Sequence, residues 1–193
     1  MLSEVRMRGG RLLVPAGVAM ALSAVVACGP SRGGGGESDS RPASPTPARF
    51  DEEVVLADGR RVGLSYAAGR GLLEQHRDAG TGTWSEPHLV HATSSDPCRS
   101  MTVEAFDGTV AVIADWGHYC ADGEPPTESV AAVGTADPAR WDTRLSRNFD
   151  GWEKVTAVDG SRRLRFTRVS TEWLTRLEWS RTDGFAQVDE IPR

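Results

Sequence analysis

Among the Asp-Gly dipeptides of this 193-residue chain, three recur at nearly regular spacing along its C-terminal three quarters and constrain its fold more than any other feature. They are Asp58-Gly59, Asp107-Gly108 and Asp159-Gly160, spaced 49 and then 52 residues apart. Each stands between two runs of strand-forming residues. Asp-Gly favours a two-residue β-hairpin turn because glycine adopts positive φ without steric strain. The spacing therefore predicts three repeated units, each built around a hairpin.

Each unit is expected to contain four strands, because two further strand-like runs follow every Asp-Gly hairpin. The expected strands are residues 52–57, 60–67, 70–77 and 84–90, then 101–106, 109–115, 128–134 and 141–147, then 152–158, 161–168, 172–179 and 185–191. No helical periodicity of comparable length is present. The sequence predicts an all-β fold of three four-stranded antiparallel meanders.

The residue patterns of two expected strands indicate which of their faces are buried. Residues 110–114 are apolar at every position, which is typical of a strand buried on both faces. Arg163-Leu164-Arg165-Phe166 alternates between charged and apolar residues. We therefore expect the first of these strands to be enclosed and the second to keep one face in water.

A polar turn precedes the aromatic residue that opens each fourth strand. These turns, at 78–80 before Trp84, 135–139 before Trp141 and 180–184 before Phe185, resemble the Asp-boxes of sialidase-like propeller blades, Ser-x-Asp-x-Gly-x-Thr-Trp. The resemblance implies that the aspartate accepts hydrogen bonds from backbone amides of the turn and that the aromatic residue packs between sheets. It also implies that the three units are blade-like.

The number of units leaves the closure of the fold open. A propeller closes with about four or more blades, and this chain has three. The meanders could instead form a β-sandwich or barrel, an open array of blades, or half of a six-bladed ring completed by a second copy in a homodimer.

The N-terminal segment has the pattern of an export signal. Three arginines at positions 6, 8 and 11 precede sixteen uncharged residues, 12–27, too few for a membrane span of about 20 residues. The run ends in Val25-Val26-Ala27-Cys28, which resembles the lipobox of bacterial lipoproteins. The resemblance implies cleavage after Ala27, lipidation of Cys28 and anchoring of the protein to the extracytoplasmic face of the cell membrane.

The sequence thus divides into three parts. Residues 1–27 are the expected signal peptide, and residues 28–49 are the lipidated cysteine followed by a Gly/Ser/Pro-rich linker that lacks the apolar residues needed to fold. Residues 50–193 form the β domain, with repeats at about 50–97, 98–149 and 150–193. A net charge of −5 and a pI of about 5.4 argue against nucleic-acid binding.

Cysteine arithmetic predicts one disulfide. With Cys28 lipidated, Cys98 and Cys120 remain as an even pair in an oxidising compartment. If Asp107-Gly108 is a hairpin turn, the two cysteines approach each other at the open end of that hairpin.

The densest group of functional side chains follows the enclosed strand. Asp115, Trp116, His118 and Tyr119 lie where this strand ends and a longer connection begins, and loops at strand ends often carry binding sites. The alternative is a disulfide-held loop whose aromatic side chains cover the core. Most of the remaining tryptophans are likewise expected between sheets.

No catalytic, cofactor or metal motif is evident. His88 and His91 do not suggest a metal site, because residues i and i+3 of a regular strand face opposite sides. The sequence therefore favours a lipid-anchored, non-catalytic binding or interaction module for a cell-wall glycan or a protein partner. The alternatives are a sialidase-like carbohydrate hydrolase and an accessory subunit of an envelope complex.

Overall fold

The computed structural model describes residues 49–135, 140–160 and 162–193, which lie within one compact unit, Pro45–Arg193. Three predicted segments lie outside the described residues: the signal peptide, the linker up to residue 48 with Cys28, and most of the turn at 135–139. In the described part of the chain, no helix has the length and apolar character needed to cross a membrane.

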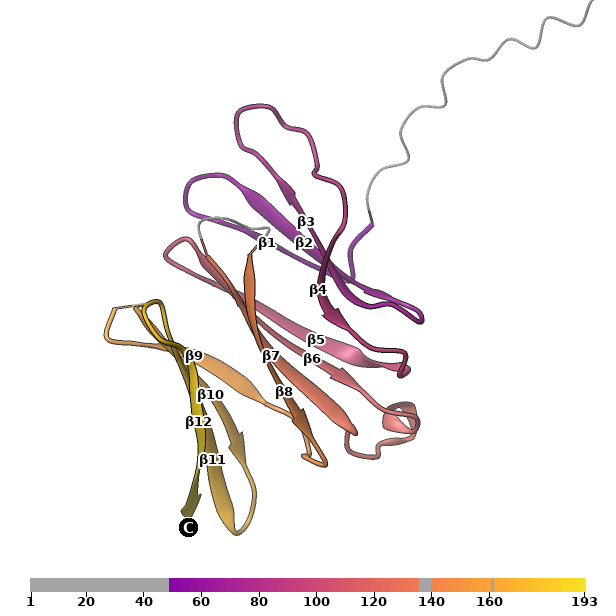
Figure 1. Cartoon of the computed structure of the whole chain (residues 1–193), viewed down its shortest axis with the longest axis vertical. Coiled ribbons are helices and arrows are strands. Elements are labelled where there is room, and N and C mark those ends of the chain that lie inside the picture. Colours follow the sequence, from indigo (N-terminus) through magenta and orange to yellow (C-terminus); the bar gives the residue numbers. More distant parts are fainter. Residues whose placement is uncertain (1–48, 136–139, 161) are drawn as a thin grey trace, which may run out of the picture. The chain divides into compact units, whose positions relative to one another are not determined.

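Twelve strands form three four-stranded antiparallel sheets (Figure 1). The first sheet contains β1 (Glu52–Val55), β2 (Arg61–Ala67), β3 (Gly71–Arg77) and β4 (His88–Ala92). The second contains β5 (Pro97–Phe106), β6 (Thr109–Trp116), β7 (Glu128–Gly134) and β8 (Trp141–Arg147), and the third contains β9 (Lys154–Val158), β10 (Arg163–Val169), β11 (Trp173–Ser180) and β12 (Gly184–Pro192). Within each sheet the strands pair in chain order. The prediction of three four-stranded meanders is confirmed, and η1 (Cys120–Asp122) is the single short helical element among the described residues.

The Asp-Gly turns differ in length. Phe106 pairs with Thr109 across Asp107 and Gly108, whose φ angles of 46° and 75° match the predicted two-residue turn. The other two turns are longer than predicted. In the first, Leu56 donates to the Arg60 carbonyl at 2.8 Å, which leaves three residues in the loop. In the third, the last strand pair before the turn is Val158 with Arg163.

The fourth strand of the first sheet begins later than expected. Trp84 makes only an isolated bridge to Arg77, and β4 starts at His88. Pro87 directly before the strand lacks the amide hydrogen that a continuous ladder would need.

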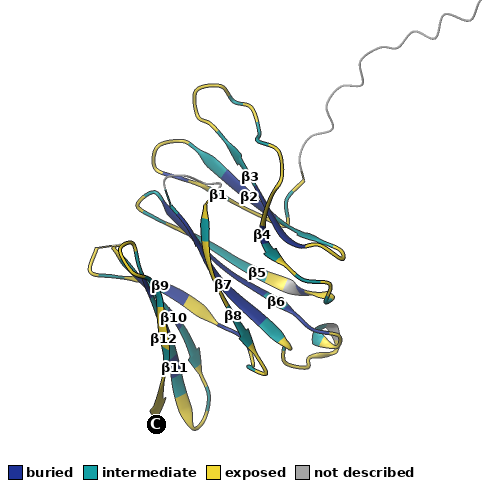
Figure 2. Cartoon of the chain, viewed as in Figure 1, coloured by how far each residue is buried: buried dark blue, intermediate teal, exposed yellow. Residues whose placement is uncertain are grey.

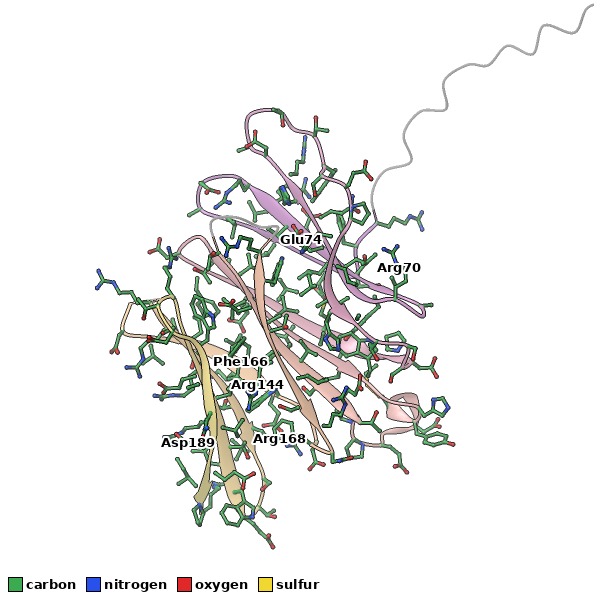
Figure 3. The ribbon with its side chains drawn as sticks, in the orientation of Figure 1. Arg70, Glu74, Arg144, Phe166, Arg168 and Asp189 are labelled. Atoms are coloured by element: carbon green, nitrogen blue, oxygen red, sulfur yellow. A yellow bond between two sulfur atoms is a disulfide. The ribbon has the colours of Figure 1, made fainter. Side chains whose placement is uncertain are left out.

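The three sheets share two hydrophobic cores, one on each face of the second sheet (Figure 2). Val110, Val112 and Ala114 of β6 pack with the first sheet. Ala111 and Ile113 of the same strand pack with the third sheet, against residues that include Phe166, which is labelled in Figure 3. The prediction that residues 110–114 form a strand buried on both faces is confirmed. The alternative of a β-sandwich is not found, because the described residues form three successive sheets and a sandwich has two facing sheets.

The face of the third sheet that points away from the second carries charged residues near the start of β10, as the alternation there predicted, and apolar residues near its end, where Leu174 pairs with Val169 and Ile191. Arg163 Nη2 and Arg165 Nη2 lie 2.8 Å and 2.7 Å from the Glu178 carboxylate on β11. Leu164 and Phe166, which alternate with these arginines in sequence, are fully buried in the core. The ion-paired part of this face needs no further sheet to cover it, whereas Val169 and Ile191 are exposed apolar residues at its other end.

The opposite end of the stack is covered by the chain itself. The Phe50 ring lies 4.5 Å from the Trp84 ring on the outer face of the first sheet, and a Cβ at Gly63 would overlap the Phe50 ring. Arg61 lies over Trp84, with its guanidinium carbon 5.8 Å from the ring centroid. Phe50 thus covers an aromatic residue on a face that has no neighbouring sheet.

Equivalent strands of successive sheets contact one another. The first strands make contacts between β1 and β5 and between β5 and β9, and the fourth strands make contacts between β4 and β8 and between β8 and β12. The three meanders are therefore stacked in the same sense, so that the 1–2 and 3–4 turns of all three sheets lie at one end and the 2–3 turns lie at the other.

Candidate functional site

The four candidate binding residues at the end of β6 and in the loop beyond it do not form a single cluster. Trp116 is only 1% exposed and belongs to the core between the first and second sheets, where its ring centroid lies 5.3 Å from those of Tyr66 and His91. The Asp115 side chain points to the opposite face of β6. A Cβ built on Gly151 would lie 3.5 Å from both Asp115 carboxylate oxygens.

Asp115 is held in a confined polar environment between the second and third sheets. Burial is the main cause that raises the pKa of its carboxyl from 3.8 to about 6, against the opposing effects of a hydrogen bond with Ser129 and the charge of Arg168. Arg168, which is labelled in Figure 3, itself donates to Glu153 at 2.7 Å and to Asp150 at 3.1 Å. The Asp115 backbone amide donates to the Tyr66 hydroxyl at 3.1 Å, which links this end of β6 to the first sheet.

His118 and Tyr119 are exposed on the loop beyond. His118 Nδ1 lies 3.0 Å from Asp96 Oδ2, and the His118 ring meets the Tyr119 ring edge-on with centroids 5.7 Å apart. Cys98 and Cys120 form a disulfide at the base of this loop, as predicted, with Cα atoms 5.4 Å apart. Of the four candidate ligand-binding residues, only His118 and Tyr119 are both accessible and in contact with each other.

The two histidines of β4 do not face the sides of the strand that the sequence predicted. Leu72 pairs with His91 while Leu73 pairs with Leu89, so β4 has one extra residue at a bulge. His88 and His91 are consequently opposite Glu74 and Leu72, alternate residues that share one face of β3. The prediction that they face opposite sides is wrong, because it assumed a regular strand. The described residues include no group of three or more His, Cys, Asp or Glu side chains placed to hold a metal ion.

A groove lies at the other end of the sheets, where β7 and β11 end and β8 and β12 begin. Its volume is about 710 Å³, and all three sheets contribute to its lining. The described lining residues, which define the Trp141 groove, are His88, Leu89, Val90, Val133, Thr135, Arg140, Trp141, Asp142, Trp179, Arg181, Thr182, Asp183 and Gly184. Its position at strand ends and its mixture of aromatic and polar side chains are typical of a binding site.

Packing orients the aromatic residues of the groove. A Cβ at Gly134 would lie 3.0 Å from two atoms of the Trp141 indole, so the ring lies directly over the glycine backbone. Trp141 packs on the core between the first and second sheets, whereas Trp179 belongs to the core between the second and third. Trp179 Nε1 donates to Asp142 Oδ2 at 2.8 Å, which positions that carboxylate.

The turn between β11 and β12 forms one wall of the groove. Asp183 Oδ2 accepts hydrogen bonds from the Ser180 and Thr182 hydroxyls, both at 2.8 Å, and these bonds hold the pKa of Asp183 below its usual value. Arg181 Nη2 donates to the hydroxyl of the buried Thr109 on β6 at 3.0 Å. The wall is therefore attached to the second sheet as well as to its own.

The Asp-box resemblance implies roles that the turns fulfil in part. Asp78 Oδ1 accepts from the backbone amides of Gly80 and Thr81, both at 2.9 Å, as the resemblance implies. Asp183 is bonded by hydroxyl groups instead. Trp141 and Phe185 pack on the two cores between sheets, whereas Trp84 lies on the outer face of the first sheet.

Sequence reasoning missed the groove because its residues come from three distant segments. Trp141 was singled out only as a packing residue of its repeat. The burial of Glu74 was also not predicted, because no local pattern marks it. Its carboxylate is fully buried; Glu74 pairs with His88 on β4, and its Oε1 lies 3.1 Å from His76 Nδ1 (Glu74 is labelled in Figure 3).

Comparison with known proteins adds no assignment to this geometry. The sequence matches no protein-family model, and no curated protein sequence matches it significantly.

Proposed function

We propose that this protein is a lipid-anchored extracytoplasmic lipoprotein that binds a component of the cell envelope, without catalysis, in the Trp141 groove. One observation carries the binding role. The groove is formed jointly by three sheets, and hydrogen bonds or packing orient its tryptophans, its aspartates and Arg181. The lipobox-like Val25-Val26-Ala27-Cys28 supports the anchor.

The position of the groove suits a tethered binding module. The Tyr66 amide at the end of β2 donates to Asp51 at 2.7 Å, so the chain enters the domain at the end that carries the 2–3 turns. The Trp141 groove opens at the opposite end, beside the 3–4 turns. A ligand can therefore reach the groove without obstruction by the segment that follows the linker.

Stacking of equivalent strands and the amide-bonded Asp78 turn support the proposal that the meanders are propeller-type blades. We propose an open, self-sufficient array of three blades. The ion-paired outer face of the third sheet and the Phe50 cover on the first both favour this form over half of a closed ring.

The anchor is tested by Cys28→Ala in a bacterial host that processes lipoproteins. We expect the wild-type protein in the membrane fraction and the variant in the soluble extracytoplasmic fraction, because the variant lacks the acylated thiol. A Ser38→Ala variant in the expected linker is the matched control and should stay with the membranes. Retention of the Cys28→Ala protein on membranes would contradict the anchor.

The binding role is tested by cosedimentation of the detergent-solubilised full chain with cell envelopes of the source bacterium. Trp141→Ala should lower the bound fraction at least tenfold, whereas Trp173→Ala, a half-exposed tryptophan at the far end of β11, should not. Equal binding by both variants, or no binding by the wild type, would refute the groove as the site. Time-dependent release of sugars that Asp142→Asn abolishes would favour the hydrolase.

A further inference from the structure

We infer that the ligand of the Trp141 groove is a neutral glycan chain of several sugar units. This inference rests on the proposed binding function and names the ligand class for the same site. Size, charge and aromatic geometry each contribute to it.

The groove has room for more than a single sugar ring. It begins at β4 of the first sheet, crosses the end of β7 and β8, and reaches the β11–β12 turn of the third sheet. Its volume of about 710 Å³ lies within the range of about 300–1,000 Å³ that sites for drug-sized ligands occupy. A ligand of several sugar units fits this volume and can contact all three sheets.

The charges of the described lining balance. Arg140 and Arg181 line it together with Asp142 and Asp183, and His88 is a further polar group. Asp142 and Asp183 already accept the hydrogen bonds from Trp179 and from the Ser180 and Thr182 hydroxyls. A charged polymer would meet one like charge for each opposite charge in such a lining and would gain little net attraction from it.

Hydroxyl-rich ligands match this arrangement better. Carboxylates accept hydrogen bonds, guanidinium groups donate them, and each hydroxyl or acetamido group of a sugar can pair with either. Thr135 and Thr182 offer both functions. A peptide would need pockets for large apolar side chains, and Leu89, 44% exposed, is the one large exposed aliphatic residue in the described lining.

Trp141 supplies a stacking surface whose orientation is set before binding. The glycine at position 134 lets the indole lie on the backbone of β7, and any side chain there would displace it. Trp141 is partly buried and lines the groove. The apolar face of a sugar ring can pack on such a fixed aromatic plane with little loss of side-chain entropy.

The test is isothermal titration of the full chain, solubilised in a detergent without a sugar headgroup. The probes are four hexamers. Those of N-acetylglucosamine and of β-1,4-linked glucose are neutral, that of glucosamine is cationic, and that of galacturonate is anionic. At least one neutral hexamer should bind at least tenfold more tightly than either charged hexamer and more tightly than its own dimer.

Variants assign the binding to the groove. Trp141→Ala should weaken binding of the neutral hexamer at least tenfold, Trp141→Phe should retain most of it, and Trp173→Ala should leave it unchanged. The melting temperature of each variant separates loss of the ring from loss of the fold.

The outcomes separate this inference from the proposed function. Tighter binding of a charged hexamer, lost in Trp141→Ala, would overturn the neutral ligand class and leave the groove as a binding site. Binding of no hexamer while envelopes still capture the protein through Trp141 would likewise overturn the glycan and retain the function. Neutral binding unaffected by Trp141→Ala would overturn the assignment to the groove.

Discussion

At the scale of single residues, Asp115 is the clearest link between burial and chemistry. Its carboxyl lies between two sheets, and burial raises its pKa from 3.8 to about 6. Between these values the folded protein holds a proton that the unfolded chain releases, so the free energy of unfolding falls as pH rises from about 4 to 6. The contribution is fully present below pH 3.8 and is lost above pH 6.

Asp115→Asn should remove this pH dependence. Because the shift is about two pKa units and the site is partly screened, we expect the wild type to lose about 2 kcal/mol from this group between pH 4 and 7, and the variant to lose none of it. Urea denaturation at pH 4, 5, 6 and 7 measures the difference. Asp122→Asn, at an exposed carboxyl on η1, is the control. Parallel pH profiles for wild type and Asp115→Asn would show that the raised pKa does not affect stability.

At the scale of elements, the faces of the outer sheets decide whether each meander is stable in water. Phe50 substitutes for a neighbouring sheet by covering Trp84, and Gly63 leaves room for its ring. Phe50→Ala should lower the free energy of unfolding by about 1–3 kcal/mol, less than for a fully buried phenylalanine. Chemical denaturation measures this loss.

Val169→Ala, at a half-exposed position at the end of β10, is the matched control and should change stability by less than about 1 kcal/mol. If Phe50→Ala cost no more than the control, the ring would not stabilise the outer face of the first sheet.

At the scale of the whole domain, the two outer faces bear on its oligomeric state. A ring of six blades would bury the Arg163 and Arg165 pairs with Glu178, and removing these charges from water would cost more than their mutual attraction returns. We therefore expect residues 45–193 to elute with the mass of one chain in size exclusion with light scattering at every concentration tested. A dimer that persists on dilution would instead favour a six-bladed ring.

The sequence alone determined the strands, their grouping and much of their burial. Alternation in β10 and the continuous apolar run in β6 are local patterns with a period of two, and the Asp-Gly spacing marks the repeats without reference to tertiary contacts. The Cys98–Cys120 pairing followed from the position of one hairpin, although the register along β5 is irregular.

Tertiary structure decided what these local patterns do not encode. A bulge in β4 placed His88 and His91 on one face, and the packing of a sheet on each side of β6 enclosed Trp116 in one core and confined Asp115 beside Gly151 on the other side. The Trp141 groove exists only because three sheets meet, with Trp141 and Trp179 belonging to separate cores. Local periodicity specifies which residues share a strand face, whereas packing between sheets, which brings together residues far apart in the chain, specifies which faces meet.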